Sequence, residues 1–195
     1  MSDATGAAVL LDRDGTINVD TGYVSDPASI CLEDGVLDGL RRLTAAGLPL
    51  IILSNQSGVG RGYFDLCDVV DVNHSIAEQL AAHDIEVAGW YVCPHAPADQ
   101  CDCRKPLPGL ALRAAKDFSL DLRRCWMIGD KRSDLQMADA VGASSILLLT
   151  GEGAQHSDWA TATDKPVCAT LAEAAELILA ASSVAAAWRR SEAGR

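Results

Sequence analysis

AAVLLDRDGT, the stretch at residues 7–16, joins five apolar side chains directly to a pair of carboxylates. So short and continuous an apolar run predicts a buried strand of a parallel sheet rather than a surface helix. In an extended segment, residues two apart point to the same side, so Asp12 and Asp14 are expected to share one small space. Taken alone, the pattern leaves an alternative, because an aspartate often caps the helix that follows it.

Short apolar runs and amphipathic stretches alternate along the chain, which predicts an α/β fold. This alternation indicates a Rossmann-like parallel sheet with helices on both faces and ligands bound at the carboxyl ends of the strands. Polar residues that directly follow strands are therefore the functional candidates. The expected strands are 7–11, 50–54, 87–92, 126–129 and 145–149. The expected helices lie near 38–46, 65–83, 110–118, 135–141 and 171–181.

The composition bounds the domain count and the class of partner. A chain of 195 residues that is 49% hydrophobic suits one well-buried domain and is too short for two ordinary ones. We expect a single domain over residues 1–195 that ends in a C-terminal tail over 182–195. A formal net charge of -11 argues against binding nucleic acid or an anionic membrane, since either needs a basic surface. The expected partner is a small molecule, and the expected state is a monomer.

Two apolar stretches near the ends of the chain are short. Residues 7–11 are too few for a secretory signal, and residues 177–188 are too few to span a bilayer. We therefore expect a cytoplasmic protein.

A loop of small and polar residues, SNQSGVGRG at 54–62, follows the second expected strand. It supplies a hydroxyl, an amide, and glycines that let backbone N–H groups approach an anion. This composition suits a phosphate. A flexible connection is the alternative interpretation.

Charged residues follow later strands of the expected sheet. Arg104 and Lys105 stand just before an expected helix, whose N-terminus also favours anions. A lysine there can neutralise a phosphoryl group, although adjacent basic residues are more often a solvated surface pair. Asp130 ends the fourth expected strand and is a candidate ligand for Mg²⁺, a hard cation that prefers carboxylate oxygens. Asp134 is a weaker candidate for Mg²⁺ than Asp130, and its expected role is that of a helix cap or ion-pair partner.

Three of the seven cysteines crowd into residues 93–103 together with a histidine. The four candidate ligands are Cys93, His95, Cys101 and Cys103. This set is sufficient for a closed tetrahedral zinc site, although its spacing is not that of common zinc fingers, and reduced loop thiols are the alternative. A closed site leaves no coordination position for chemistry, so the zinc would shape the loop that presents Arg104 and Lys105.

In their order and their places after strands, these segments resemble the four motifs of the haloacid dehalogenase-like phosphatases, over residues 9–179. Within that superfamily, LDRDGTIN at 11–18, GYV at 22–24 and CRKP at 103–106 are most similar to the D-glycero-D-manno-heptose 1,7-bisphosphate phosphatases. Histidinol phosphate phosphatase domains are similar too. Ser54 departs from the heptose pattern, which usually has threonine there, but it keeps the hydroxyl.

The resemblance implies a Mg²⁺-dependent phosphatase in which Asp12 attacks phosphorus and forms a phospho-aspartyl intermediate. Asp14 would act as acid and then base, while Ser54 and Lys105 stabilise the transferring phosphoryl group. Mg²⁺ would be held by the Asp12 carboxylate, the Asp14 backbone carbonyl and Asp130, and zinc by the cysteine-rich loop. The expected substrate contacts are Asp20, Thr21, Gly22, Tyr23, Asn55, Gln56, Ser57, Arg61, Arg104 and Lys131.

The implied reaction removes the C7 phosphate of D-glycero-D-manno-heptose 1,7-bisphosphate, in the biosynthesis of nucleotide-activated heptose for a lipopolysaccharide core or related glycan. Histidinol phosphate is the alternative substrate. A non-catalytic, zinc-stabilised sugar-phosphate-binding protein is the alternative of another class, but Asp12, Asp14 and Asp130 are all present. Segments 15–49 and 56–86 are too short for a cap domain, so we expect an open site whose loops set specificity.

Overall fold

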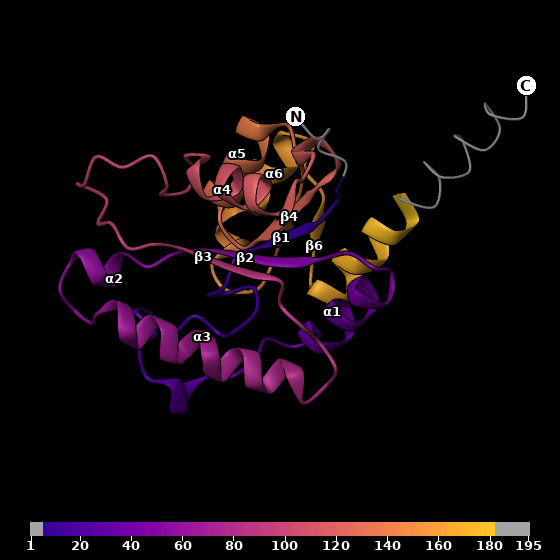
Figure 1. Cartoon of the computed structure of the whole chain (residues 1–195). Helices are drawn as coiled ribbons and strands as arrows, with labels where there is room; N and C mark the ends of the chain where they lie inside the picture. Colours follow the sequence, from indigo (N-terminus) through magenta and orange to yellow (C-terminus); the bar gives the residue numbers. More distant parts are fainter. Residues whose placement is uncertain (1–5, 182–195) are drawn as a thin grey trace, which may run out of the picture.

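The computed structural model describes residues 6–181, which form a six-stranded parallel sheet covered by helices on both faces (Figure 1). The strand order is β3-β2-β1-β4-β5-β6, so β1 lies inside the sheet between β2 and β4. The predicted α/β fold is confirmed. The strands are β1 (Val9–Leu11), β2 (Leu50–Asn55), β3 (Gly89–Cys93), β4 (Trp126–Gly129), β5 (Ser144–Leu148) and β6 (Val167–Cys168).

The register of the central strands brings their polar ends together. Leu11 of β1 pairs with Ile52 of β2 and Ile128 of β4. Two residues beyond these partners stand Ser54 and Asp130, and Asp12 follows Leu11 directly. Because the strands are parallel, these three polar residues meet at the same edge of the sheet, where α/β folds bind ligands.

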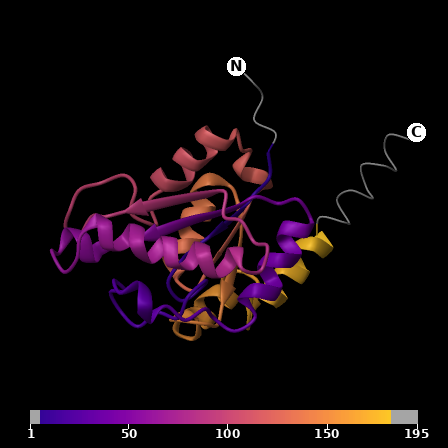
Figure 2. The same ribbon diagram turned by 60° about the horizontal axis from the view of Figure 1, so that its bottom comes forward.

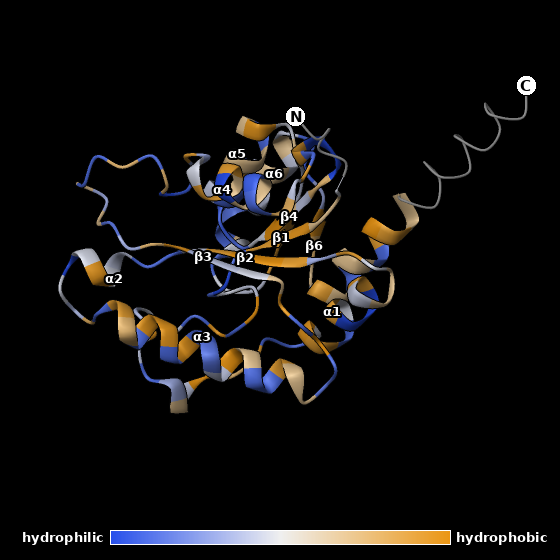
Figure 3. Cartoon of the chain, viewed as in Figure 1, coloured by the Kyte–Doolittle hydropathy of each residue, from blue (hydrophilic) through white to orange (hydrophobic). Residues whose placement is uncertain are grey.

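Alternate residues of each strand enter two separate hydrophobic cores. Val9 and Leu11 pack into the core under α1 (Val36–Ala45), α3 (Leu66–Ala81) and the helical residues 171–181. Leu10 packs into the core under α4 (Gly109–Phe118) and α5 (Arg132–Val141). The two helical layers are visible in Figure 2, and Figure 3 shows that β1 and β2 are apolar while α1 and α3 carry both apolar and hydrophilic residues.

Local sequence signals set the ends of the main helices. Asp65 begins α3 with a capping box, in which its carboxylate accepts the Asp68 N–H at 3.1 Å and the Asp68 carboxylate accepts the Asp65 N–H at 2.8 Å. Gly142 ends α5 with a positive φ of 74°, a conformation that glycine adopts without steric cost. The sequence thereby specifies where the chain turns back toward the sheet.

The structure adds short elements that the periodicity did not predict. These are α2 (Ser57–Gly60), α6 (Ser157–Ala162), β6 and the 3₁₀ turns η1 (Pro27–Ser29), η2 (Leu122–Arg124) and η3 (Gly153–His156). Elements of two to six residues are too short to show a repeating apolar pattern. α5 also begins three residues earlier than expected, at Arg132 rather than 135.

The segments that follow β1 and β2 contain only turns, loops and the helices α1, α2 and α3, so residues 6–181 include no cap domain. Among the helices of residues 6–181, none combines the length and the hydropathy of a membrane span. The expected tail at 182–195 lies outside the described residues.

Gly39 tests the packing of α1 against the helical residues 171–181. A Cβ at Gly39 would lie 2.5 Å from the backbone oxygen of Leu171. In an open helix, Gly→Ala stabilises by up to about 1 kcal/mol. Here the contact with the Leu171 backbone makes the substitution destabilising instead. Gly39→Ala should lower the free energy of unfolding by about 1–3 kcal/mol in urea titrations.

The matched control is Arg41→Ala, an exposed position on the same helix. It should change the free energy of unfolding by less than about 0.5 kcal/mol. A Gly39→Ala variant as stable as the parent protein would contradict the proposed packing.

Candidate active site

A cavity of about 440 Å³ opens at the carboxyl edge of the sheet. Most of the predicted catalytic and substrate-binding residues line this cavity: Asp12, Asp14, Asp20, Gly22, Tyr23, Asn55, Gln56, Ser57, Arg104, Lys105 and Lys131. Ser54 and Asp130 are buried and do not line it. Thr21 and Arg61 do not line it either.

Lys105 is a buried cation that lines the cavity. Its Nζ lies 2.7 Å from Asp12 Oδ1 and 2.6 Å from Asp134 Oδ1, and it donates a hydrogen bond of 2.7 Å to the Leu53 carbonyl. Burial disfavours the ammonium, but the two carboxylates outweigh burial and raise the pKa of Lys105. Lys105 is therefore a fixed positive charge beside Asp12.

Asn55 holds the Lys105 peptide from the end of β2. Its side-chain oxygen accepts the Lys105 N–H at 3.0 Å, and its side-chain amide donates to the Lys105 carbonyl at 3.1 Å. This reciprocal pair resembles the hydrogen bonds between two strands. It fixes the loop before α4 to β2 and so fixes the direction in which the lysine side chain leaves the backbone.

Carboxylate oxygens of Asp12, Asp130 and Asp134 lie within 4.8 Å of one another, and all three residues are buried. Burial and then Asp12 raise the pKa of Asp130 to about 8, and burial also raises the pKa of Asp12. Asp130 Oδ2 accepts the Glu152 N–H at 2.9 Å, while its Oδ1 has no protein partner within residues 6–181. Such a group of hard oxygens fits a divalent cation.

Two glycines let the backbone come this close to Asp130. A Cβ on Gly15 would lie 2.8 Å from the Asp130 carboxyl carbon, and a Cβ on Gly151 would lie 3.0 Å from it. Both residues also have a positive φ, 80° at Gly15 and 52° at Gly151. Gly15, which follows Asp14, is thus required for two reasons: its φ is positive, and there is no room for a Cβ beside Asp130.

Asp14 is surrounded by hydrogen-bond donors. Arg13 contacts both of its oxygens, the nearest contact being 2.9 Å, and Asn18 donates at 3.0 Å. Gln56 donates at 2.7 Å to Asp14 Oδ2 and at 2.7 Å to Ser54 Oγ. Gln56 therefore links the carboxylate after β1 to the hydroxyl at the end of β2.

Lys131 connects the loop after β1 to the loop after β5. Its Nζ lies 3.0 Å from Asp20, 3.3 Å from Glu152 and 3.9 Å from Asp130. Burial disfavours the ammonium, but the neighbouring carboxylates outweigh burial and raise the pKa of Lys131. Burial likewise opposes ionisation of Asp20, but the Gly22 N–H and Lys131 lower its pKa. These two oppositely charged groups both line the cavity.

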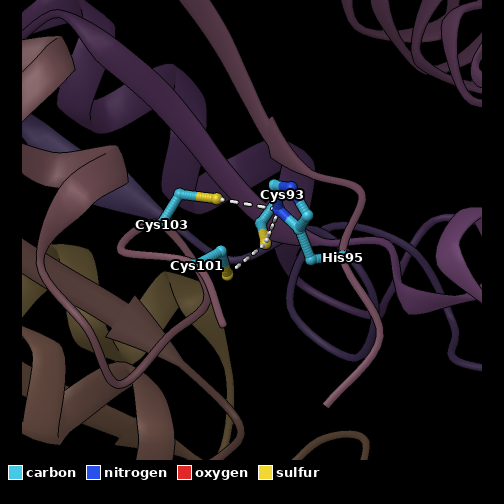
Figure 4. A group of neighbouring side chains, drawn as sticks. All are labelled: Cys93, His95, Cys101 and Cys103. Carbon is cyan, nitrogen blue, oxygen red and sulfur yellow. Dashed lines mark hydrogen bonds between the residues drawn. The ribbon is translucent and has the colours of Figure 1, made fainter. Parts of the chain in front are cut away.

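The four candidate zinc ligands converge in the loop after β3 (Figure 4). His95 Nδ1 lies 3.5 Å from Cys93 Sγ and 3.3 Å from Cys103 Sγ, and the sulfurs of Cys93 and Cys101 are 3.9 Å apart. Ligands at zinc bond lengths in a tetrahedron are separated by about 3.6–3.8 Å. The observed spacing therefore fits a tetrahedral metal site with three sulfurs and one nitrogen.

Two residues that build the site, Arg13 and Glu152, carried no clear signal in the sequence. The Arg13 side chain contacts Asp14. Glu152 donates its backbone N–H to Asp130 and pairs with Lys131 through its carboxylate. Asp134, by contrast, was expected as a helix cap or ion-pair partner, and it has both contacts: it accepts the Lys131 N–H at 3.0 Å, near the start of α5, and pairs with Lys105. A periodic pattern cannot reveal contacts such as those of Glu152, because they depend on how separate segments are brought together.

The HAD-hydrolase-like family matches residues 102–174 of this chain. A D-glycero-beta-D-manno-heptose-1,7-bisphosphate 7-phosphatase of Yersinia pestis is 37% identical over 165 residues, covering 78% of this chain and 88% of the relative. The enzyme of the same name from Helicobacter pylori is 40% identical over 147 residues, covering 75% of this chain and 84% of the relative.

Solved structures agree in fold. The D,D-heptose 1,7-bisphosphate phosphatase from B. bronchiseptica, complexed with magnesium and phosphate, is 33% identical and superposes with a TM-score of 0.83, covering 90% of this chain and 98% of that chain. The D,D-heptose 1,7-bisphosphate phosphatase from Burkholderia thailandensis is 27% identical with a TM-score of 0.67, covering 90% of this chain and 99% of that chain.

Asp134 tests the buried charge pair. Asp134→Asn removes one of the two carboxylates that hold Lys105 and should lower the free energy of unfolding by about 3 kcal/mol. Guanidinium titrations monitored by circular dichroism measure this change. The control is Asp139→Asn on the same helix, where an exposed carboxylate pairs with Lys165 and the loss should be at most about 1 kcal/mol. Equal losses in both variants would count against a stabilising role for the Lys105 pair.

Proposed function

We propose that this chain, which belongs to the family of D-glycero-D-manno-heptose 1,7-bisphosphate 7-phosphatases among the haloacid dehalogenase-like hydrolases, removes the C7 phosphate of that sugar bisphosphate. The observation that carries the activity is the geometry after β1. Asp12 stands against a buried lysine, while Asp14, two residues on, lines the same cavity among hydrogen-bond donors.

The charge of the site supports a requirement for Mg²⁺. Lys105 contacts Asp12 and Asp134, while Lys131, 3.9 Å from Asp130, is shared with Asp20 and Glu152. Carboxylates outnumber these two lysines, so a phosphate dianion would be repelled without a further cation. We assign the ion to the Asp12 carboxylate, the Asp14 backbone carbonyl and Asp130. When bound, it would neutralise the oxygens of the substrate phosphate and orient that group toward Asp12.

In the first step, a carboxylate oxygen of Asp12 attacks phosphorus in line with the C7 oxygen. The bond between phosphorus and the C7 oxygen breaks, and Asp14 gives its proton to the leaving oxygen. Lys105 lies 2.7 Å from Asp12 Oδ1, where it can stabilise negative charge on the transferring group. The Ser54 hydroxyl, held by Gln56 at 2.7 Å, is the proposed neutral partner of that group.

In the second step, water hydrolyses the phospho-aspartate. Asp14 is now a carboxylate and takes a proton from the water as the water attacks phosphorus. The bond between phosphorus and the Asp12 oxygen breaks, which frees inorganic phosphate and restores both carboxyl groups. One residue thus serves as acid and then as base because the first step leaves it in the form that the second requires.

Positive charge beyond Lys105 supports a substrate with two phosphates. Arg104 and Lys131 both line the cavity, whereas Arg61 does not. We assign the non-reacting phosphate to this part of the cavity, where its binding can orient the sugar for the reaction at C7. The product, a heptose 1-phosphate, is a substrate for nucleotide activation, which places the reaction in the synthesis of lipopolysaccharide or a related glycan.

We assign zinc to the cysteine-rich loop. All four ligand positions would be filled by the protein, so the ion would have no open position for catalysis. Cys103 precedes Lys105 by two residues, and the loop also carries Arg104. The zinc would therefore hold the segment that presents both cations to the cavity.

A phosphate-release panel tests the substrate. With Mg²⁺ present, both anomers of the heptose bisphosphate and histidinol phosphate are compared by kcat/KM. We expect the bisphosphate to be preferred by at least about tenfold, since the second phosphate adds a charged contact. Asp12→Asn is the control for contaminating phosphatase and should release essentially no phosphate. A higher kcat/KM for histidinol phosphate would overturn the heptose assignment but leave the phosphatase mechanism standing.

Elemental analysis of freshly purified protein tests the zinc site. We expect about one zinc per chain, as a closed four-ligand site requires. Cys101→Ser should lose that zinc and lower the melting temperature, because the loop depends on the ion for its structure. Cys67→Ser, which alters an exposed cysteine in α3, is the matched control and should retain zinc. Parent protein without zinc would remove the assignment.

A further inference from the structure

Arg13, the residue between the two carboxylates, does not line the cavity and is fully buried, with 0% of its side chain exposed. A guanidinium stays charged in proteins, so its burial requires partners that accept its hydrogen bonds. Within the described chain, its side-chain donors reach two residues. They are Asp14, its neighbour in sequence, and Asn73 in the middle of α3.

The contact with Asp14 fixes the orientation of a carboxylate plane. Arg13 Nη2 donates to Asp14 Oδ2 at 2.9 Å and to Oδ1 at 3.0 Å, and Arg13 Nε donates to Oδ1 at 3.1 Å. A planar guanidinium that reaches both oxygens restrains rotation of the carboxylate, which a single donor does not. Asn18 and Gln56 each reach only one oxygen of Asp14.

The contact with Asn73 fixes the guanidinium itself. Arg13 Nη1 donates to Asn73 Oδ1 at 3.0 Å, across sixty residues of sequence. Val72 and Ile76 of α3 are both buried in the core under the sheet, so this part of the helix has a defined position. The location of Asp14 thus depends on α3, although that helix contributes no residue to the lining of the cavity.

We propose that Arg13, anchored by Asn73, is a positioning residue that holds the Asp14 carboxylate at the angle required for proton transfer. The inference rests on the proposed function, because it takes Asp14 as the acid and base of the reaction. Proton transfer requires hydrogen-bond reach and alignment, and a displacement of about 1 Å can lower the rate by about 100-fold. Loss of the anchor would affect kcat and leave substrate binding largely intact.

Asn73→Ala tests the anchor, because it removes the acceptor at a position outside the cavity lining. We expect kcat to fall on the order of tenfold, with KM changed by less than about twofold. Asn73→Asp restores an acceptor of the same shape and should return kcat to within about threefold of the parent value. His74→Ala, at the adjacent exposed position on α3, is the matched control and should leave kcat unchanged.

A second variant tests the guanidinium directly. Arg13→Lys keeps the charge but cannot reach both oxygens of Asp14, so kcat should fall by about 100-fold. Circular dichroism establishes that each variant is folded, and an Arg13→Lys protein that does not fold leaves the decision to the Asn73 pair. Unchanged kcat in Asn73→Ala, or equal losses in Asn73→Ala and Asn73→Asp, would overturn the proposal.

The same measurements separate this proposal from the substrate assignment. The ratio of variant kcat to parent kcat is taken on whichever sugar phosphate or histidinol phosphate the parent hydrolyses best. If the parent prefers histidinol phosphate, the substrate assignment fails, while the ratio still decides the role of Arg13. If the parent prefers the heptose bisphosphate and the ratio is unchanged, the positioning role alone fails.

Discussion

The burial of the Lys105 ammonium is the constraint on which the site depends. An ammonium with 1% of its side chain exposed costs several kcal/mol unless partners replace its water shell. Those partners are Asp12 after β1, Asp134 in α5 and the Leu53 carbonyl in β2. All three must be in place together, so the packing of β1, β2 and α5 determines where the Asp12 carboxylate stands.

The same arrangement leaves the edge of the sheet short of positive charge. Three buried carboxylates face one another; Lys105 contacts two of them, and Lys131, shared with Asp20 and Glu152, lies 3.9 Å from the third, Asp130. Burial and Asp12 nevertheless raise the pKa of Asp130 to about 8. A bound divalent cation would reverse this effect, because it favours the ionised form of every nearby carboxylate. The charges that the fold buries therefore favour a divalent cation at this edge of the sheet.

The sequence predicted those parts of the protein whose signals are local. Continuous apolar runs predicted the five longer strands, and polar residues after them predicted most of the cavity lining. Contacts between distant segments were not predictable in this way. Asn55, expected as a substrate contact, lines the cavity, and its side-chain amide also pairs with the Lys105 peptide, a partner that nothing within 54–62 indicates. Glu152 also lines the cavity without a signal in the sequence, because a short loop after β5 brings its backbone to Asp130.

The cysteine-rich loop after β3 (residues 93–103) and the loop after β2 (residues 54–62) form one hydrogen-bonded unit. The Gln56 N–H donates to the Cys93 carbonyl at 2.8 Å, and the Gly60 N–H donates to the Pro94 carbonyl at 2.8 Å. A Cβ on Gly60 would lie 2.5 Å from the Ala96 backbone nitrogen, so only glycine allows this approach. Asn55 adds the reciprocal pair with Lys105. An ion that fixes the loop after β3 would therefore also fix the backbone that carries Gln56, the side chain that joins Ser54 to Asp14.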